Sequence, residues 1–490
     1  MFHFHIRKTK SSAEMHARPW RSYLLALLLD LLALAANQLA VHSSAFADEY
    51  SHYVYRVLSL GIGSVMGLLP FSVVELLLYA TILFVLFDFV KQLCRAVRAG
   101  AACVHSPRVS QASRTHAEAS TNSKNVASNT ESQQHTGAAC PTHLLAAVAR
   151  PLRHFLGHLF LILSTLLILY VFLCGINYHR TSFSEEAGLS VTIDAHGTVY
   201  DDADLVALCD YLVTEINDTE AQLAATTSDA NADVLRAHTS ADTVTAGSTT
   251  ESPAATVEAS GPSAADETAA TTIQVKGACI GQTSETPKPS AAWLWHAGRT
   301  GQRAMEKLGQ RYHRLSGHYP YPKPILNTWI LSVQQTTGVY SPFTVEANYN
   351  RDIAYYDIPF TICHELSHLR GYMQEEEANF IGVLATIGAD DLYFNYSGYV
   401  SAWVYAGNAL ARIDSTAFAT LYSRINTRTR QDMLYNNAYW QQFEGKPAEA
   451  HEQLNDAYLK MQGQATGVRS YGHVTDLMLE YFAENGTLTQ

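Results

Sequence analysis

Charged residues are scarce in this sequence. Asp, Glu, Lys and Arg make up 16% of its 490 residues, whereas about a quarter is usual in a soluble protein. The formal net charge is −12 and no basic face offsets it, so the composition argues against a nucleic-acid partner. The seven cysteines include no Cys-x-x-Cys pair, which argues against a cysteine-based metal site. There is also no internal repeat.

Long apolar runs account for the low charge. Three of them, at about 23–41, 71–90 and 155–176, are close to the roughly 20 residues that a helix needs to cross the hydrocarbon layer. A shorter, glycine-rich run at 60–69 is predicted to be re-entrant or interfacial. Asp30 and Glu75 interrupt the long runs, and we expect them to face other helices or the interface rather than to mark a functional pathway.

Basic residues predict the orientation of these helices. Arg and Lys are frequent in the N-terminal tail and in the loop after the second run, whereas the loop after the first run has only Arg56 nearby. The sequence therefore predicts a multi-pass protein of the cell membrane, with the lipid bilayer as a partner and the C-terminal domain outside the cytoplasm. As an alternative for the first run, Ala45-Phe46-Ala47 before Asp48 resembles a signal-peptidase site, and cleavage there would remove one helix.

Five parts are expected along the chain. They are a cytoplasmic tail (1–21), the first two transmembrane helices with the re-entrant or interfacial segment (22–98), a cytoplasmic low-complexity loop (99–152), the third transmembrane helix (153–177) and an extracytoplasmic domain (178–490). Within the last part, 226–290 is rich in Ala, Thr, Ser, Asp and Glu and is expected to be a disordered insertion. Cys209 and Cys279 lie in this outer part, where they form either a disulfide or two unpaired buried thiols.

The outer domain is predicted to be α+β and mostly helical. Strands are expected at 325–333 and 338–348, because apolar and β-branched residues dominate the first and alternate with polar ones in the second. Helices are expected from Pro359 onward. The second strand reads as a half-buried sheet edge, the kind of edge to which metallopeptidases add an extended substrate. Whether Glu346 on it touches a substrate stays open.

The motif His364-Glu365-Leu366-Ser367-His368 carries the chemistry. Residues four apart share one face of a helix, so both imidazoles can bind one metal ion. A catalytic Zn²⁺ takes three protein ligands and leaves one position for water, and Glu365 is placed to accept the proton of that water. A helix surface without a metal is the alternative interpretation.

A third metal ligand is expected just after the motif. Gly371 can end the histidine helix, and the next helix opens with acidic residues. Glu375 is the preferred ligand because Asn379, four residues later, can support an imidazole or the carboxylate. Glu377 is the second choice. The candidate electrophiles for a tetrahedral intermediate are Tyr396, Tyr399, Arg469, Tyr471 and His473, and Tyr471 is preferred because it lies in a glycine-flanked loop. A packed aromatic is the ordinary role of any one of the 27 tyrosines.

Several stretches together resemble a bacterial membrane family called domain of unknown function 3810. The resemblance implies three membrane spans and an outer domain similar to zinc peptidases. Its Glu-x-x-Ala-Asn element is also similar to that of gluzincin peptidases, in which the first glutamate binds zinc, which favours Glu375. In many gluzincins the gap before this glutamate is longer than seven residues. The stretches are 69–72 with Glu75, 175–178 with Arg180, 342–348, 363–371, 377–380, 396–399, 458–460 and 470–472.

These features together predict a zincin-like domain on a three-helix anchor. The expected function is a membrane-anchored, zinc-dependent metallopeptidase that hydrolyses peptide bonds of a peptide or protein substrate outside the cytoplasm. The alternatives are a zinc-binding protein without turnover, such as a sensor or an envelope scaffold, and a membrane interaction protein in which the motif is incidental. The sequence leaves the oligomeric state open.

Overall fold

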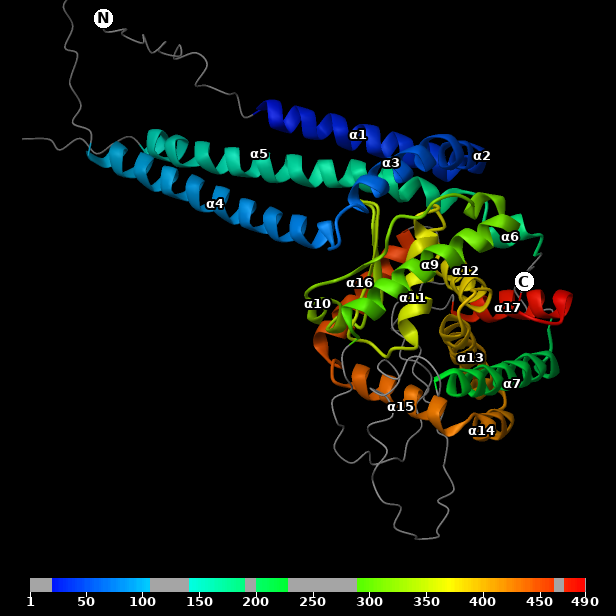
Figure 1. Ribbon diagram of the computed structural model, residues 1–490. Coiled ribbons are helices and arrows are strands. Elements are labelled where there is room, and N and C mark those ends of the chain that lie inside the picture. The colour runs from blue at the N-terminus through cyan, green and yellow to red at the C-terminus, as the bar shows by residue number, and fades with distance from the viewer. Residues whose placement is uncertain (1–19, 106–140, 190–199, 228–288, 462–470, 490) are drawn as a thin grey trace, which may run out of the picture. The chain divides into compact units, whose positions relative to one another are not determined.

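The computed structural model describes residues 20–105, 141–189, 200–227, 289–461 and 471–489 (Figure 1). The chain divides into two compact units. Unit 1 comprises Met1–Leu31 and Leu78–Leu167, and unit 2 comprises Leu32–Leu77 and Ile168–Gln490. Most of the predicted insertion, at 228–288, lies outside the described residues, as do Cys279 and the loop 106–140. Cys209 is described as a free, buried thiol.

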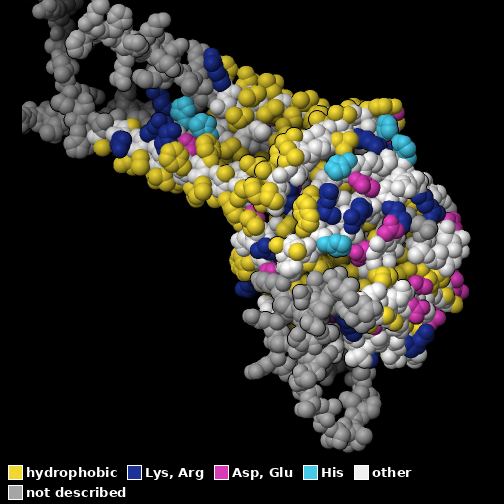
Figure 2. All heavy atoms as spheres, in the orientation of Figure 1, with side chains coloured by type: hydrophobic (Ala, Val, Ile, Leu, Met, Phe, Trp, Pro, Cys, Tyr) yellow, Lys and Arg dark blue, Asp and Glu magenta, His cyan; other side chains and the backbone are white. Residues whose placement is uncertain are grey.

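Among the described residues, three helices are long and apolar enough to cross a membrane, as the sequence predicts. These segments are Trp20–His42, Val73–Ala101 and Val148–His179. Many of their large apolar side chains are exposed to the surroundings, for example Leu83 at 67% and Phe87 at 66%. Figure 2 shows hydrophobic side chains covering much of the described surface of these helices.

Polar contacts join the long helices within unit 1. The Tyr23 hydroxyl donates to the Arg153 carbonyl oxygen at 2.8 Å, and His158 Nδ1 lies 2.9 Å from Asp88 Oδ2. The helices are also longer than expected, since they extend into both ends of the stretch 99–152 that was predicted to be a loop. They are α1 (Trp20–His42), α4 (Val73–His105) and α5 (Pro141–Leu173).

Unit 2 begins with short helices that follow the first candidate span. They are α2 (Ser44–Glu49), the π-helix η1 (Tyr50–Tyr55) and α3 (Arg56–Met66). The stretch predicted to be re-entrant or interfacial is therefore mostly the helix α3. Its Gly63 lies against Pro320, where an added Cβ would meet the proline ring at 2.7 Å. Close packing on Pro320 explains the glycine at position 63.

The core of unit 2 is built around one helix, α11 (Asp357–His368), all of whose residues are buried. It packs against α9, α12, α13 and two strands, so it is enclosed on all sides, and most of its apolar residues lie opposite the face that carries both histidines. The remaining helical elements of unit 2 are η2 (Gly175–His179), α6 (Phe183–Ala187), α7 (Asp202–Thr227), α9 (Ala291–Arg311), η3 (His313–Leu315), α10 (Trp329–Ser332), α12 (Glu375–Ile387), α13 (Leu392–Ile413), α14 (Ser415–Arg424), α15 (Thr427–Gln441), α16 (Lys446–Met461) and α17 (Tyr471–Asn485).

One three-stranded sheet, in the order β1-β3-β2, lies beside α11. The strands are β1 (Lys323–Pro324), β2 (Gly338–Ser341) and β3 (Glu346–Tyr349). The prediction of a strand at 325–333 is wrong, because most of that stretch is a loop and the short helix α10. A short apolar run does not distinguish a strand from a buried helix. The strand predicted at 338–348 is instead the antiparallel hairpin β2–β3, which turns after Ser341 at Pro342.

Two buried carboxylates fix the start of α4 to this sheet. Glu346 accepts hydrogen bonds from the backbone N–H groups of Val73 and Val74, at 3.1 and 2.9 Å, and forms an ion pair with Lys323. In return, Glu75 accepts from the N–H groups of Leu326 and Asn327 at 2.8 and 2.9 Å. Glu346 is 3% exposed. It therefore has a structural role at the end of a helix and does not face a substrate groove.

Candidate metal centre

The histidine motif lies in the last two turns of α11. Asp357 stands in the first turn of this helix, where a carboxylate favours the helix dipole, and Pro359 is tolerated there because its missing N–H would be unpaired in any case. His364 and His368 are one helical turn apart and therefore project from the same side. Their rings are edge to face, with centroids 4.8 Å apart.

A tight turn brings the acidic residue back over the imidazoles. The turn depends on Gly371, whose φ is +85°, a conformation that costs other residues more. The Gly371 N–H donates to the His368 carbonyl oxygen at 2.9 Å, and α12 begins at Glu375. This geometry explains how only seven residues can separate the second histidine from the third candidate ligand.

Three possible ligand atoms converge at this point. His364 Nε2 lies 3.1 Å from His368 Nε2 and 3.1 Å from Glu375 Oε2, and His368 Nε2 lies 3.7 Å from Glu375 Oε1. Among the described residues, this is the group of His, Cys, Asp and Glu side chains with a spacing that could hold a metal ion. The structure thus brings together the three residues that the sequence proposed as ligands.

The outer nitrogens of both imidazoles have oxygen partners. His364 Nδ1 lies 2.8 Å from Asn379 Oδ1, the side chain that the sequence analysis expected in a supporting role. His368 Nδ1 lies 2.6 Å from the Tyr372 carbonyl oxygen. A carbonyl oxygen can only accept, so Nδ1 of His368 carries the proton and its Nε2, when the ring is neutral, presents a lone pair.

Burial and charge act on these groups in opposite directions. Burial lowers the pKa of His368 to about 4, so this ring is neutral at pH 7. Burial also lowers the pKa of His364, but the hydrogen bond and charge of Glu375 outweigh it and raise that pKa above its ordinary value. Glu375 has a lowered pKa because the two histidines outweigh its burial. The cluster therefore favours a bound positive charge, either a proton or a metal ion.

The side chains fit a zinc ion on two counts. With Zn–N bonds of about 2.0–2.1 Å in a tetrahedron, ligand atoms stand roughly 3.3 Å apart. The measured separations are 3.1 Å between the two imidazole nitrogens, and 3.1 and 3.7 Å from these nitrogens to Oε2 and Oε1 of the Glu375 carboxylate, respectively. In addition, the Glu375 side chain is only 15% exposed and lies against both imidazoles, and a carboxylate with so little solvent favours a bound cation. Two imidazoles, a carboxylate and oriented outer nitrogens form a typical zinc donor set.

Glu365 stands beside the cluster without joining it. Its Oε1 is 4.0 Å from His364 Nε2, and its Oε2 is buried with no hydrogen-bond partner. Burial raises the pKa of Glu365 to about 8. A carboxylate with a raised pKa is a stronger base than usual, which suits proton transfer near neutral pH.

The edge strand β2 approaches Glu365 closely at Gly338. A Cβ at this position would lie 2.5 Å from Glu365 Oε1 and 2.8 Å from Thr361 Cγ2, so only glycine allows the strand to pass here. Sequence analysis did not single out this glycine. The following residue, Val339, is 38% exposed, so the edge next to the proposed base is partly open to solvent.

The other candidate site residues lie elsewhere. Glu377, the alternative ligand, accepts hydrogen bonds from the Ser184 N–H and hydroxyl at 3.0 and 2.8 Å. The Tyr396 hydroxyl donates to Asp432 at 2.8 Å, and the Tyr399 ring packs on Tyr211. Tyr471 begins α17, but its side chain is outside the described part of the chain. Arg469 is also outside it.

Residues 143–479 match the family described as protein of unknown function (DUF3810). The chain belongs to the DUF3810 family. The family match includes the third candidate span, α11 and the Glu375–Asn379 segment, whereas the stretch 69–72 in the first part of the chain lies outside it. No curated protein and no solved structure matches the chain.

Two supporting contacts had no signal in the sequence. The partner of His368 Nδ1 is the backbone carbonyl of Tyr372, so the residue type at position 372 gives no indication of this hydrogen bond. The Tyr55 hydroxyl donates to the His368 carbonyl oxygen at 3.1 Å from 313 positions away in the sequence. A contact between segments so far apart depends on the tertiary fold, whereas Asn379 could be predicted because it lies one helical turn from Glu375.

Proposed function

We propose that this protein is a membrane-anchored, zinc-dependent peptidase with a zincin-like outer domain. The convergence of His364, His368 and Glu375 beside an unpartnered Glu365 is the observation that supports it best. The proposed ligands would hold one zinc ion and leave one position open. A bound zinc ion would polarise a substrate carbonyl and lower the pKa of a water molecule toward about 7.

The side chains of this chain have distinct roles in the proposal. Glu365 accepts a proton from the attacking water and returns it to the leaving amine, since its free oxygen adjoins the metal position without being a ligand. Asn379 and the Tyr372 carbonyl orient the imidazoles through their Nδ1 atoms. Tyr471 remains the proposed electrophile for the oxyanion.

A peptide is the proposed substrate because of the sheet edge. Strand β2 is an outer strand of the sheet, and Gly338 lies directly against Glu365. An extended peptide that pairs with this edge through its main chain would run past the proposed base.

The proposed location of the hydrolysis is outside the cytoplasm. The three candidate spans supply the anchor, and the distribution of Lys and Arg favours a cytoplasmic tail and loop. In this arrangement α11 and the other helices that follow the third candidate span face the extracytoplasmic side.

Glu365→Gln is the direct test of the proposed reaction. The full-length protein in detergent would be incubated with a broad peptide library, and products would be identified by mass spectrometry. We expect cleavage by the wild type, and a loss of at least a thousandfold in Glu365→Gln with the metal content unchanged, because only the base is removed. Glu306→Gln, an exposed acid on α9, is the matched control.

Two outcomes would contradict the assignment. Cleavage by Glu365→Gln at the wild-type rate would show that another group is the base. A wild-type protein that retains its metal but cleaves nothing would favour the alternative, a zinc-binding sensor or scaffold. The burial of the two histidines, which are 5% and 6% exposed, is the observation that keeps this alternative in view.

A further inference from the structure

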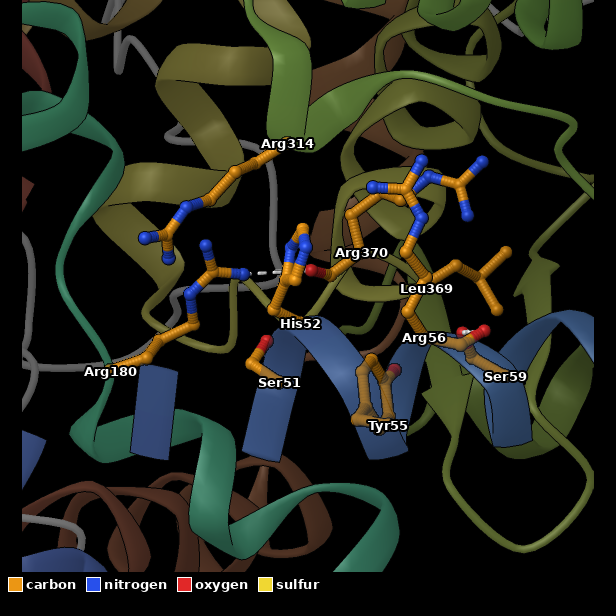
Figure 3. Close-up of a pocket in the computed structure, with 9 residues that line it drawn as sticks. All are labelled: Ser51, His52, Tyr55, Arg56, Ser59, Arg180, Arg314, Leu369 and Arg370. Carbon is orange, nitrogen blue, oxygen red and sulfur yellow. Dashed lines mark hydrogen bonds between the residues drawn. The ribbon is translucent and has the colours of Figure 1, made fainter. Parts of the chain in front are cut away.

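A second site in unit 2 is rich in arginine (Figure 3). The pocket is small and opens to solvent. Its charged lining consists of Arg56, Arg180, Arg314 and Arg370, together with the ring of His52. None of these residues belongs to the proposed zinc site, although Arg370 follows His368 by two positions.

Two of the arginines are neutralised by shared carboxylates. Arg180 and Arg314 both contact Glu186 Oε1, at 2.8 and 3.0 Å, and Arg314 also contacts Asp48 at 3.0 Å. These two carboxylates have further donors, since Asp48 accepts from Thr181 and Glu186 accepts from Tyr372. Both carboxylates are therefore already paired with donors in this half of the pocket.

Arg56 and Arg370 are not compensated by carboxylates in this way, although the Arg370 guanidinium lies over the Tyr319 ring, 4.0 Å from its centre. Arg56 donates to the Ser316 carbonyl and hydroxyl oxygens, both at 3.1 Å, and Arg370 donates to the His318 carbonyl oxygen at 2.6 Å. Neither forms an ion pair with a carboxylate in the part of the chain that the structure describes. Their Nη2 atoms both reach Gly317, at 3.4 and 3.5 Å from the position of an added Cβ, so the two positive groups are neighbours.

This arrangement is unfavourable without an anion. Arg370 is 6% exposed, and its Nε is buried without a hydrogen-bond partner. Burial and the charge of Arg370 together lower the pKa of Arg56. The buried Arg370 and the partly exposed Arg56 are adjacent positive groups that repel each other, and an anion between them removes this repulsion.

We propose that the pocket binds a phosphate group, carried by a membrane lipid or free in solution. Guanidinium groups match phosphate oxygens with paired hydrogen bonds. Arg180 directly follows the candidate span Val148–His179, and such a position is at the level of lipid head groups. The pocket also includes Ser51 and Tyr55 of the π-helix η1, an irregularity that is frequent at functional sites.

Phosphate binding to the full-length protein in detergent tests the proposal. Inorganic phosphate would be titrated by calorimetry, with chloride at equal ionic strength as the blank. Arg56→Gln is expected to weaken binding at least tenfold. Arg56→Lys keeps the charge but not the paired donors, so it is expected to weaken binding by a smaller factor. This variant replaces Arg56→Gln in the test if the glutamine variant does not fold. Arg412→Gln, an exposed arginine on α13, is the matched control and is expected to bind as the wild type does.

A parallel experiment separates the two sources of phosphate. Native mass spectrometry would count phosphatidylglycerol molecules retained by the same variants. Retention that falls in Arg56→Gln and not in Arg412→Gln, without binding of inorganic phosphate, would assign the site to a lipid head group. Binding of inorganic phosphate that depends on Arg56 would show that the free anion suffices. If neither inorganic phosphate nor the lipid depends on Arg56, the proposal is wrong.

Discussion

The imidazoles of His364 and His368 direct their Nε2 atoms at one point because each Nδ1 faces an oxygen on the outer side. For His368 that oxygen is a main-chain carbonyl at 2.6 Å. When the ring is neutral, its proton therefore lies on Nδ1 and its lone pair on Nε2. Two lone pairs that face each other and an adjacent carboxylate create a site for a cation. At the scale of single residues, the sequence motif is therefore completed by contacts that lie outside it.

Substitution of Glu375 and of Glu377, one at a time, tests which of the two is the third zinc ligand. Glu375→Gln should weaken zinc binding by more than a hundredfold, because the carboxylate 3.1 Å from His364 Nε2 is replaced by a neutral amide. Glu377→Gln should leave the affinity within a factor of three, because this side chain bonds to Ser184. Competition with a chromophoric chelator measures both affinities. The reverse order of effects would make Glu377 the ligand.

At the scale of elements, the strand β2 and the helix α11 limit each other's position. Gly338→Ala would place a methyl group 2.5 Å from Glu365 Oε1 and push the strand away from the helix. We expect a loss of stability of about 1–3 kcal/mol and a fall in hydrolysis of roughly a hundredfold, since small displacements of reacting groups are costly.

Gly61→Ala on α3 is the control for this change. An added Cβ there meets nothing within 4 Å, so its stability should change by less than about 1 kcal/mol. Thermal melting in detergent followed by circular dichroism, together with the peptide assay, compares the two variants. Equal behaviour of both would contradict the close approach of β2 to Glu365.

The sequence predicts elements well where one periodicity or motif governs them. The three long apolar runs and the histidine helix are of this kind, and both are found. It predicts poorly where an element depends on distant partners. The hairpin β2–β3 was expected as one strand. The packing of Gly63 on Pro320 and the capping of α4 by Glu346 were not predicted, because each joins segments more than 200 positions apart.

At the scale of the whole molecule, the distribution of basic residues predicts which side of the membrane each terminus occupies. Tags at both ends would be exposed to protease in right-side-out and inside-out membrane vesicles. We expect the C-terminal tag to be cleaved only in right-side-out vesicles and the N-terminal tag only in inside-out vesicles. Detergent-treated vesicles, in which both tags should be cleaved, are the control. The opposite pattern would place the metal centre in the cytoplasm.

The metal content of the purified full-length protein is the most direct test of the account. Elemental analysis before and after chelation would be made on the wild type and on His364→Ala. The geometry of His364, His368 and Glu375 predicts about one zinc per chain in the wild type, its removal by the chelator, and little or none in the variant. A folded wild type that contains no transition metal after zinc supplementation, or a variant that binds as much as the wild type, would contradict it.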